Sequence, residues 1–152
     1  MVVGTLIGAA VMLLGLLVAG LRWQLGPVVD GVRRVNRSVT NPRVMRTAGT
    51  AATQTSVIAH IGRKSGRGYE TPVDIIPTAT GLLIALPYGT RADWLRNVLA
   101  AGSATVKTQG ERIDVERPTV VATIDVADLI PRRTLRTLRL FGVNQCLQLE
   151  KS

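Results

Sequence analysis

The chain has 152 residues, and its 19 Lys and Arg against 10 Asp and Glu give a net charge of +9. This length has room for a single folded domain. One His and one Cys exclude a disulfide framework and are too few for a zinc site, so we expect no metal. Two Trp, two Tyr and one Phe are too few for the stacking surface of a single-strand nucleic-acid binder. The composition indicates a basic, rather apolar protein whose partner is anionic, and it points away from a hydrolase, a metalloenzyme and an RNA reader; we predict no nucleic-acid partner.

The first segment of the chain, residues 2–21, carries no charged side chain. At about 1.5 Å per residue it spans roughly the 30 Å hydrocarbon core of a bilayer. Nothing basic precedes it and Arg22-Trp23 follows it, unlike a cleaved secretory signal. We predict an uncleaved transmembrane anchor over 1–21, with a cleaved signal or a buried core helix as alternatives. The spacing of Gly4 and Gly8 also allows helix pairing, and hence a homodimer.

Residues 22–54 are predicted to be a basic juxtamembrane helix and linker. Between residues 22 and 46 the sequence has six arginines and one acidic residue, Asp30. The arginines are Arg22, Arg33, Arg34, Arg37, Arg43 and Arg46. This excess places the following domain on the cytoplasmic side of the cell membrane. Valines at 28, 32, 35 and 39 predict a helix over 28–39 with one apolar face. That helix either lies on an anionic leaflet or covers the domain, and both alternatives stay open.

The rest of the chain, residues 55–152, has the pattern of a β domain. Strands are predicted over 55–61, 69–76, 82–86, 103–108, 112–122 and 144–149, and helices over 92–101 and 129–141. Turns at 62–66, 78–81 and 109–110 separate strands that follow one another along the chain. The strands do not alternate with helices in βαβ units. The pattern therefore predicts a mainly β fold, an antiparallel barrel with added helices.

The segment His60-Ile-Gly-Arg-Lys-Ser-Gly66 lies at a predicted strand-to-strand turn. Glycines let a ligand approach the main chain closely, and consecutive turn amides can bind an anion. Arg63 offers a planar fork of donors, Lys64 a mobile charge and Ser65 a hydroxyl. These groups are typical of a phosphate-binding turn, although the same residues also fit a solvated hairpin tip.

Three further motifs follow this turn in order. They are Thr71-Pro72-Val73, the segment Ala85-Leu-Pro-Tyr-Gly89, and the helix 92–101 with Trp94 and Asn97. Together with the turn they resemble the deazaflavin-dependent nitroreductase family, in the flavin/deazaflavin oxidoreductase superfamily, over residues 55–110. The resemblance implies a split β-barrel of the FMN-binding kind. It also implies coenzyme F-420, an 8-hydroxy-5-deazaflavin that carries a phosphate and an oligoglutamate tail.

The resemblance assigns the site residue by residue. It implies phosphate contacts from Arg63, Lys64, Ser65 and Gly66. It implies a ring-binding groove lined by Tyr69, Thr71, Pro72, Val73, Asp74, Ala85, Leu86, Pro87 and Tyr88, and closed by Asp93, Trp94 and Asn97. The carboxylates of the tail give the positive net charge a ligand, with attraction that weakens as salt is added.

Two departures from the family's pattern bear on the substrate. Tyr88 stands where relatives carry a Lys, and residues 132–142 hold no tyrosine to activate a nitro group. We therefore predict a membrane-anchored oxidoreductase that transfers a hydride from reduced F-420 to a lipophilic acceptor, a quinone or an enone. The acceptor pocket is expected between the barrel and the 129–141 helix, with apolar surface from Leu135, Leu138, Leu140 and Phe141. Its few hydroxyl groups are expected from Tyr88, Thr134 and Thr137. Tyr88 or water is the expected proton donor; no catalytic residue is assigned beyond it.

Three other functions remain open from the sequence. The same fold with FMN leaves the extra positive charge without a ligand. A non-enzymatic membrane-attached protein that binds a coenzyme or ligand is the second. A DNA-binding module rests on charge alone, because no helix-turn-helix pattern supports it.

The remaining chemically notable side chains have structural expectations. We expect His60 to be a hydrogen-bonded structural histidine and Cys146 to be an inert buried thiol. Glu70 and Asp74 are expected to pair with Arg63 or Lys64. The arginines at 132, 133, 136 and 139 are expected on a solvated face, in reach of lipid headgroups or of the glutamate tail.

Overall fold

A computed structural model describes residues 15–16, 18–20, 22–23, 25–35 and 41–152. Most of the predicted anchor over 2–21 lies outside these residues, as does the last part of the helix predicted over 28–39. Within the described ranges, no helix combines the length and the apolar character that crossing a bilayer requires.

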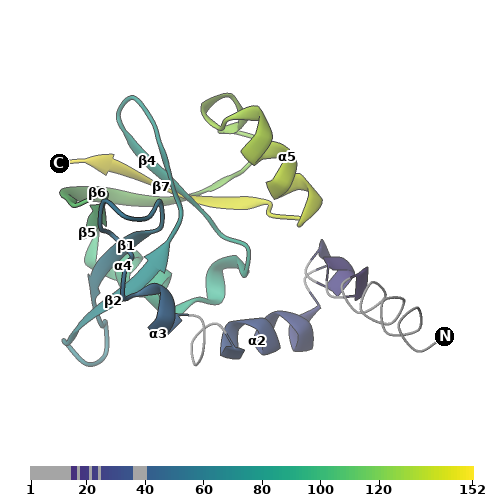
Figure 1. The fold of residues 1–152 in the computed structure, drawn as a ribbon, viewed down its shortest axis with the longest axis horizontal. Helices are drawn as coiled ribbons and strands as arrows, with labels where there is room; N and C mark the ends of the chain where they lie inside the picture. The colour runs from purple at the N-terminus through teal and green to yellow at the C-terminus, as the bar shows by residue number, and fades with distance from the viewer. Residues whose placement is uncertain (1–14, 17, 21, 24, 36–40) are drawn as a thin grey trace.

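The body of the molecule is one antiparallel sheet (Figure 1). Within the described residues its seven strands are β1 (Ser56–Ile61), β2 (Gly68–Val73), β3 (Ile75–Pro77), β4 (Gly81–Ala85), β5 (Ser103–Thr108), β6 (Glu111–Ala122) and β7 (Gln145–Lys151). They lie side by side in the order β2-β1-β5-β6-β7-β4-β3. The mainly β, antiparallel prediction is confirmed, and the sheet is curled into a half-barrel that is consistent with a split barrel.

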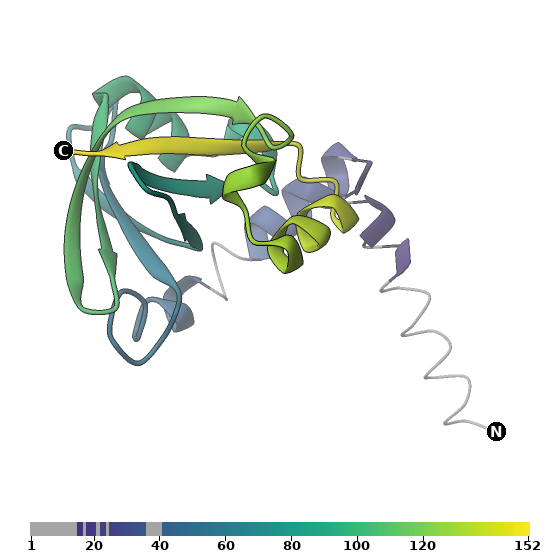
Figure 2. The ribbon, with the colours of Figure 1, turned by 90° about the horizontal axis from the view of Figure 1, so that it is seen from above.

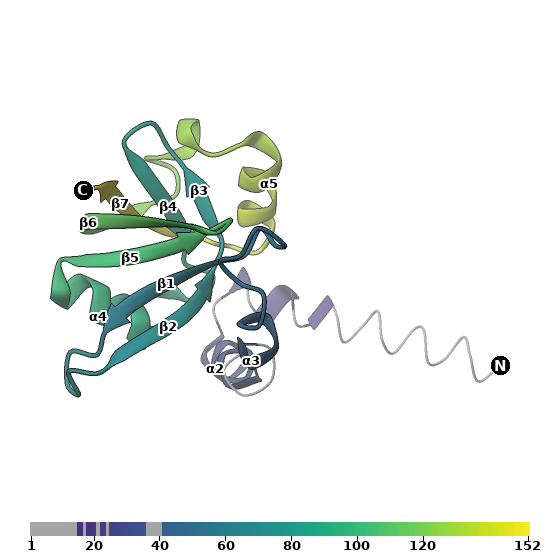
Figure 3. The same ribbon diagram turned by 60° about the vertical axis from the view of Figure 1, so that its left-hand side comes forward.

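The curl follows from how the two edge strands are connected. β2 and β3 lie at opposite edges of the sheet, yet only Asp74 separates them along the chain. The sheet must therefore bend until its edges meet at that residue, as Figure 3 shows from the side of β1 and β2. The single strand predicted over 69–76 is wrong in this respect, because Asp74 forms a corner between two strands.

Helices and short 3-10 turns from Gly26 onward accompany the sheet. They are α2 (Gly26–Val35), α3 (Asn41–Val44), α4 (Asp93–Ala101) and α5 (Arg132–Leu140), with η2 (Gly89–Arg91) and η3 (Ala127–Leu129). α4 ends at Gly102, whose positive φ of 72° lets its N–H bond to the carbonyl of Val98. The helix predicted from residue 129 begins later, at Arg132, because η3 occupies 127–129 and Pro131 precedes the first helical turn.

Apolar side chains are buried on both faces of the strands β4 and β7. Leu82, Ile84, Leu147 and Leu149 join the cluster inside the curl, which α4 closes with Leu95 and Val98. Leu83 and Cys146 point the other way, into a second cluster beneath α5 that includes Leu138. The two helices are thereby fixed to the sheet from opposite sides. The Cys146 thiol is fully buried as expected, and burial raises its pKa.

The N-terminal part of the described chain is attached to α5. Nη1 of Arg22 donates to the carbonyl oxygen of Arg139 at 2.6 Å. A Cβ on Gly142 would lie 2.6 Å from the Arg22 carbonyl oxygen, so only glycine fits this contact. α2 follows, with Val29 buried, and both α2 and α5 lie at the end of the molecule away from the C terminus (Figure 1, Figure 2). Both alternatives for the basic helix, lying on a leaflet or covering the domain, stay open.

Candidate functional site

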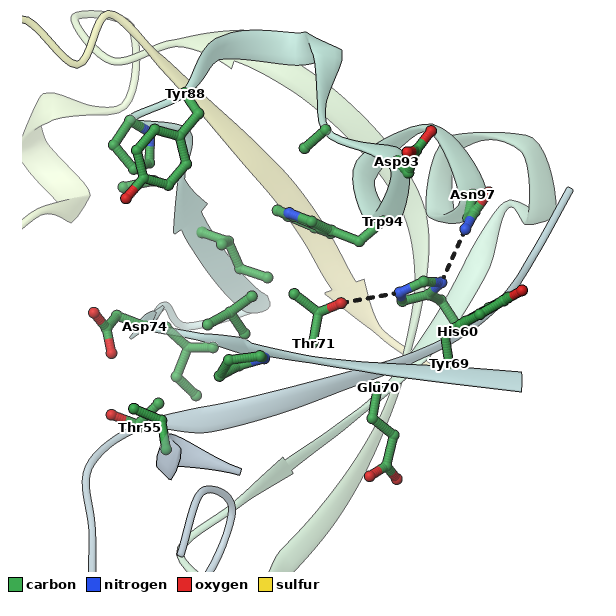
Figure 4. A pocket seen from close by; sticks show the side chains of 18 of the residues that line it. Thr55, His60, Tyr69, Glu70, Thr71, Asp74, Tyr88, Asp93, Trp94 and Asn97 are labelled. Carbon is green, nitrogen blue, oxygen red and sulfur yellow. Dashed lines mark hydrogen bonds between the residues drawn. The ribbon is translucent and has the colours of Figure 1, made fainter. Parts of the chain in front are cut away.

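A cavity of about 1570 Å³ is lined by residues of the sheet, of α4 and of α2 and α5. Figure 4 shows part of its wall. Side chains of β1 and β2, the turn after β1, and the segment from Ala85 to Asn97 form most of its wall. Asp30 and Arg34 of α2 and Thr134, Thr137 and Leu138 of α5 complete it. Pockets for drug-sized ligands are about 300–1,000 Å³. This cavity has room for a larger ligand with several chemical groups.

Fourteen of the sixteen binding residues predicted from the sequence line this cavity. They are Arg63, Lys64, Ser65, Tyr69, Thr71, Pro72, Val73, Asp74, Ala85, Pro87, Tyr88, Asp93, Trp94 and Asn97. Of the other two, Gly66 shapes the turn with a φ of 64°, and Leu86 is 4% exposed in the core. The structure brings these residues together, and their role in binding stays a prediction.

Gly62 lets the turn after β1 fold back against β2. A Cβ at this position would lie 2.5 Å from Ser65 Oγ and 2.6 Å from Cε2 of Tyr69. The N–H of Gly62 donates to the Arg67 carbonyl, and that of Gly66 donates to the Gly62 carbonyl, both at 2.8 Å. Ser65 Oγ lies 3.1 Å from the Tyr69 hydroxyl. The turn therefore holds Ser65 and its neighbouring cations at the rim of the cavity.

Arg63 is directed at α4. Its Nη2 lies 3.1 Å from Asp93 Oδ1, and its Nη1 donates to Asn97 Oδ1 at 2.8 Å. The backbone N–H of Arg63 donates to the same Asn97 oxygen at 3.2 Å. These contacts fasten the turn to the first two turns of the helix. Lys64 lies beside Arg63 and is exposed. Its flexible side chain can therefore move to contact a bound anion, whereas Arg63 is held by α4.

The predicted partners of the turn's cations are wrong. Among the described residues no ion pair joins Glu70 or Asp74 to Arg63 or Lys64. Glu70 pairs with Lys107 at 2.6 Å, because alternate residues of β2 face opposite sides of the sheet and Lys107 lies on β5.

His60 on β1 and Asn97 on α4 form a buried polar pair between the sheet and the helix. Nδ2 of Asn97 lies 3.2 Å from His60 Nδ1, and His60 Nε2 lies 3.2 Å from Thr71 Oγ1 (Figure 4). The Tyr69 ring stacks on His60 with the centroids 5.9 Å apart. Both ring nitrogens are hydrogen-bonded, as expected of a structural histidine. Burial lowers the pKa of His60 from its ordinary value of 6.5.

The free energy of unfolding is expected to fall as the pH is lowered from about 6.5 to about 5. Because the pKa of His60 is lower in the folded chain, the unfolded chain binds more protons below 6.5. The contribution of neutral His60 to the free energy of unfolding is fully present above pH 6.5, and it is lost as the pH falls through the folded pKa of His60. Urea unfolding across this range should show a steeper loss for the parent than for His60→Gln, which does not titrate there. Equal slopes in the two proteins would contradict this assignment.

The predicted cavity face of α5 is confirmed in part. Thr134, Thr137 and Leu138 line the wall. Leu135 and Phe141 pack instead against the second core cluster, and Leu140 is 59% exposed. Besides Leu138, further apolar surface in the wall comes from Val44, Met45, Ile75, Ile76 and Ile84. Tyr88 lies across the cavity from His60 and Asn97 (Figure 4).

Comparisons with known proteins give distant similarities. No protein-family model matches the chain, and no curated protein matches it. A solved structure of a protein of unknown function from Agrobacterium tumefaciens is similar with a TM-score of 0.47 and 18% identity, over 71% of this chain and 53% of that protein. A structure described as an F420 reductase has a TM-score of 0.45 and 10% identity, over 65% and 86%. An FMN-binding protein from Syntrophomonas wolfei has a TM-score of 0.46 and 12% identity, over 81% and 92%.

Proposed function

We propose that this protein is an oxidoreductase of the deazaflavin-dependent nitroreductase type that binds coenzyme F-420 in the cavity. One observation carries the proposal. The residues that the sequence resemblance assigns to the coenzyme come from four separate segments, and all but two of them line one cavity of about 1570 Å³. Lys64 and Ser65 lie in the wall of this cavity, where they can bind an anionic group of the ligand.

The donors around the turn fit a phosphate. Lys64 supplies an exposed ammonium group, and Ser65 supplies a hydroxyl. Trp94 and Pro72 offer flat apolar surface in the groove, which suits a planar ring. When bound, reduced F-420 supplies a hydride, and the protein orients the acceptor and excludes water. Tyr88 remains the candidate proton donor at the far end of the wall.

The proposed acceptor is lipophilic, a quinone or an enone, and the proposed location is the cytoplasmic face of the cell membrane. Support comes from the apolar part of the wall, which includes Met45 and Ile76. The α2 and α5 end of the cavity is attached to Arg22, the first charged residue after the apolar segment 2–21. An anchor in the bilayer would hold this end near the lipid. Trp23, which is 71% exposed, is typical of an interfacial side chain.

Cell fractionation tests the proposed anchor. The full chain is expected to sediment with membranes and to resist carbonate extraction, because twenty apolar residues partition into the hydrocarbon core. Deletion of residues 1–21 is expected to release most of the protein, leaving at most an attachment through the arginines that high salt removes. A full-length chain found entirely in the soluble fraction would sink the anchor.

The decisive experiment for the function is titration of the detergent-purified full chain with F-420, followed by its fluorescence, with FMN as the parallel ligand. Saturable F-420 binding, together with oxidation of reduced F-420 by a quinone, is the expected result. Tighter binding of FMN would assign the FMN alternative. Binding of F-420 without turnover on quinone, enone or nitroimidazole would assign the non-enzymatic alternative.

A further inference from the structure

The direction of each hydrogen bond around Asn97 follows from Arg63. Asn97 Oδ1 receives both the backbone N–H and Nη1 of Arg63, and neither of these groups can accept a hydrogen bond. The amide oxygen therefore faces the turn, and the amide nitrogen faces His60 Nδ1 at 3.2 Å. The opposite amide orientation would place two N–H groups against two others.

The orientation of Asn97 in turn fixes the proton on His60. Since Asn97 Nδ2 is a donor, Nδ1 of His60 has to accept and carries no hydrogen. The ring is then neutral with its hydrogen on Nε2, which is consistent with the lowered pKa of a buried histidine. That Nε2–H donates to Thr71 Oγ1 at 3.2 Å.

Thr71 is the end of this chain of bonds, and it lines the cavity. Its oxygen accepts from His60, so its own hydroxyl hydrogen is left to donate. Among the residues the structure describes, His60 is the sole hydrogen-bond partner of the Thr71 side chain.

We propose that His60 and Asn97 are positioning residues that hold the Thr71 hydroxyl as a hydrogen-bond donor to the ligand in the cavity. The group it selects is an acceptor: a carbonyl oxygen, an ionised oxygen or an unprotonated nitrogen of a heterocyclic ring. The inference rests on the proposed function and deepens it, because deazaflavin and flavin rings carry such atoms. Through Asn97 the same bonds join this ring subsite to the phosphate-binding turn, since Arg63 belongs to both.

Substitution of Thr71 tests the donor. Thr71→Val keeps the shape but removes the hydroxyl, and it is expected to weaken F-420 binding about three- to tenfold. Thr71→Ser keeps the donor and is expected to bind within about twofold of the parent. Thr119→Val, an exposed threonine on β6 outside the cavity, is the matched control and should change nothing. Unchanged affinity in Thr71→Val would overturn the proposal.

The pH dependence of binding separates a positioning role from a purely structural one. A proton on Nδ1 of His60 would face the Asn97 amide hydrogens, so affinity is expected to fall as the pH is lowered through the folded pKa of His60, which burial places below its ordinary value. The glutamine of His60→Gln accepts with its oxygen and donates with its nitrogen, so this variant should keep the affinity and lose the pH dependence, whereas His60→Leu should lose affinity. The other titratable groups around His60 are the stacked Tyr69, Arg63 and Asp93 beyond Asn97, and Glu70, Arg112 and Asp114 across a smaller cavity. A His60→Gln variant with the parent's pH profile would overturn the role of His60.

Nitrogen NMR of the labelled imidazole tests, without any ligand, the relay of hydrogen bonds that runs from Arg63 through Asn97 and His60 to Thr71. The chain contains one histidine, so a protein without a polyhistidine tag gives a single imidazole signal set. Protonated Nε2 and bare Nδ1 are the expected result near neutral pH, and the Nδ1–H tautomer would overturn the relay. If the parent binds neither F-420 nor FMN, the proposed function fails; the NMR result still decides the relay separately.

Discussion

Replacement of Asn97 with alanine is expected to lower the free energy of unfolding by about 2–4 kcal/mol. The side chain is 6% exposed and bonds to both Arg63 and His60. Its loss leaves His60 Nδ1 buried without a donor, at about 1–3 kcal/mol, and removes the charge-assisted bond from Arg63 as well. Urea unfolding measures the difference. The exposed Asn144, replaced in the same way, is the control and should stay within about 0.5 kcal/mol of the parent.

Asn97→Asp divides the two halves of this expectation. The carboxylate still accepts from Arg63, but it cannot donate to His60 Nδ1. The imidazole is then expected to carry its hydrogen on Nδ1 and to have a higher pKa than in the parent, because a negative charge lies beside it. An alanine variant as stable as the parent, or an aspartate variant with the parent's histidine tautomer, would show that the contacts of Asn97 do not organise this region.

The two adjacent cations of the turn are expected to behave differently when each is replaced with alanine. Lys64→Ala should weaken F-420 binding about tenfold and leave the melting temperature unchanged, because the lysine is exposed at the rim. Arg63→Ala should weaken binding by a similar factor and also lower the melting temperature, since Arg63 holds the turn against Asp93 and Asn97. Titrations at increasing salt should give a smaller slope for Lys64→Ala than for the parent.

Arg96→Ala is the control for loss of charge alone, because Arg96 is exposed on α4 and does not line the cavity. It should bind F-420 as the parent does. Parent-like affinity of Lys64→Ala would show that the phosphate is held elsewhere. A parent-like melting temperature of Arg63→Ala would show that its contacts with α4 add nothing to stability.

The sequence predicts the strands well wherever the pattern is local. The strand over 103–108 has the predicted bounds, and the one over 112–122 begins one residue earlier, at Glu111, because Gln109-Gly110 marks the turn between them. The corner at Asp74 was missed, because the residues on both sides of it continue the alternation of one strand. Which strands become edges depends on pairings between distant segments, and no short window of sequence contains them.

The candidate site likewise has a part that local sequence motifs predict and a part that depends on contacts between distant segments. Residues within the four motifs were found because each motif is a short run with its own chemistry. The contact of His60 with Asn97 spans 37 positions, and the contributions of α2 and α5 come from the two ends of the chain. One signal was available: Asp93 and Asn97 are four apart on a helix, so they share a face and suit a single arginine.

The single residue between β2 and β3 brings the two edges of the curled sheet together at one point. Both edge strands belong to the same stretch of chain, 68–77, so a shift of one edge at this corner also moves the other. The gap at the corner is set by one backbone unit, at Asp74, which also lines the cavity. The number of residues at this corner therefore limits how far apart the ends of β2 and β3 can lie, and with them the walls of the cavity. A glycine inserted after Asp74 is expected to widen the groove and to leave the turn at 62–66 intact.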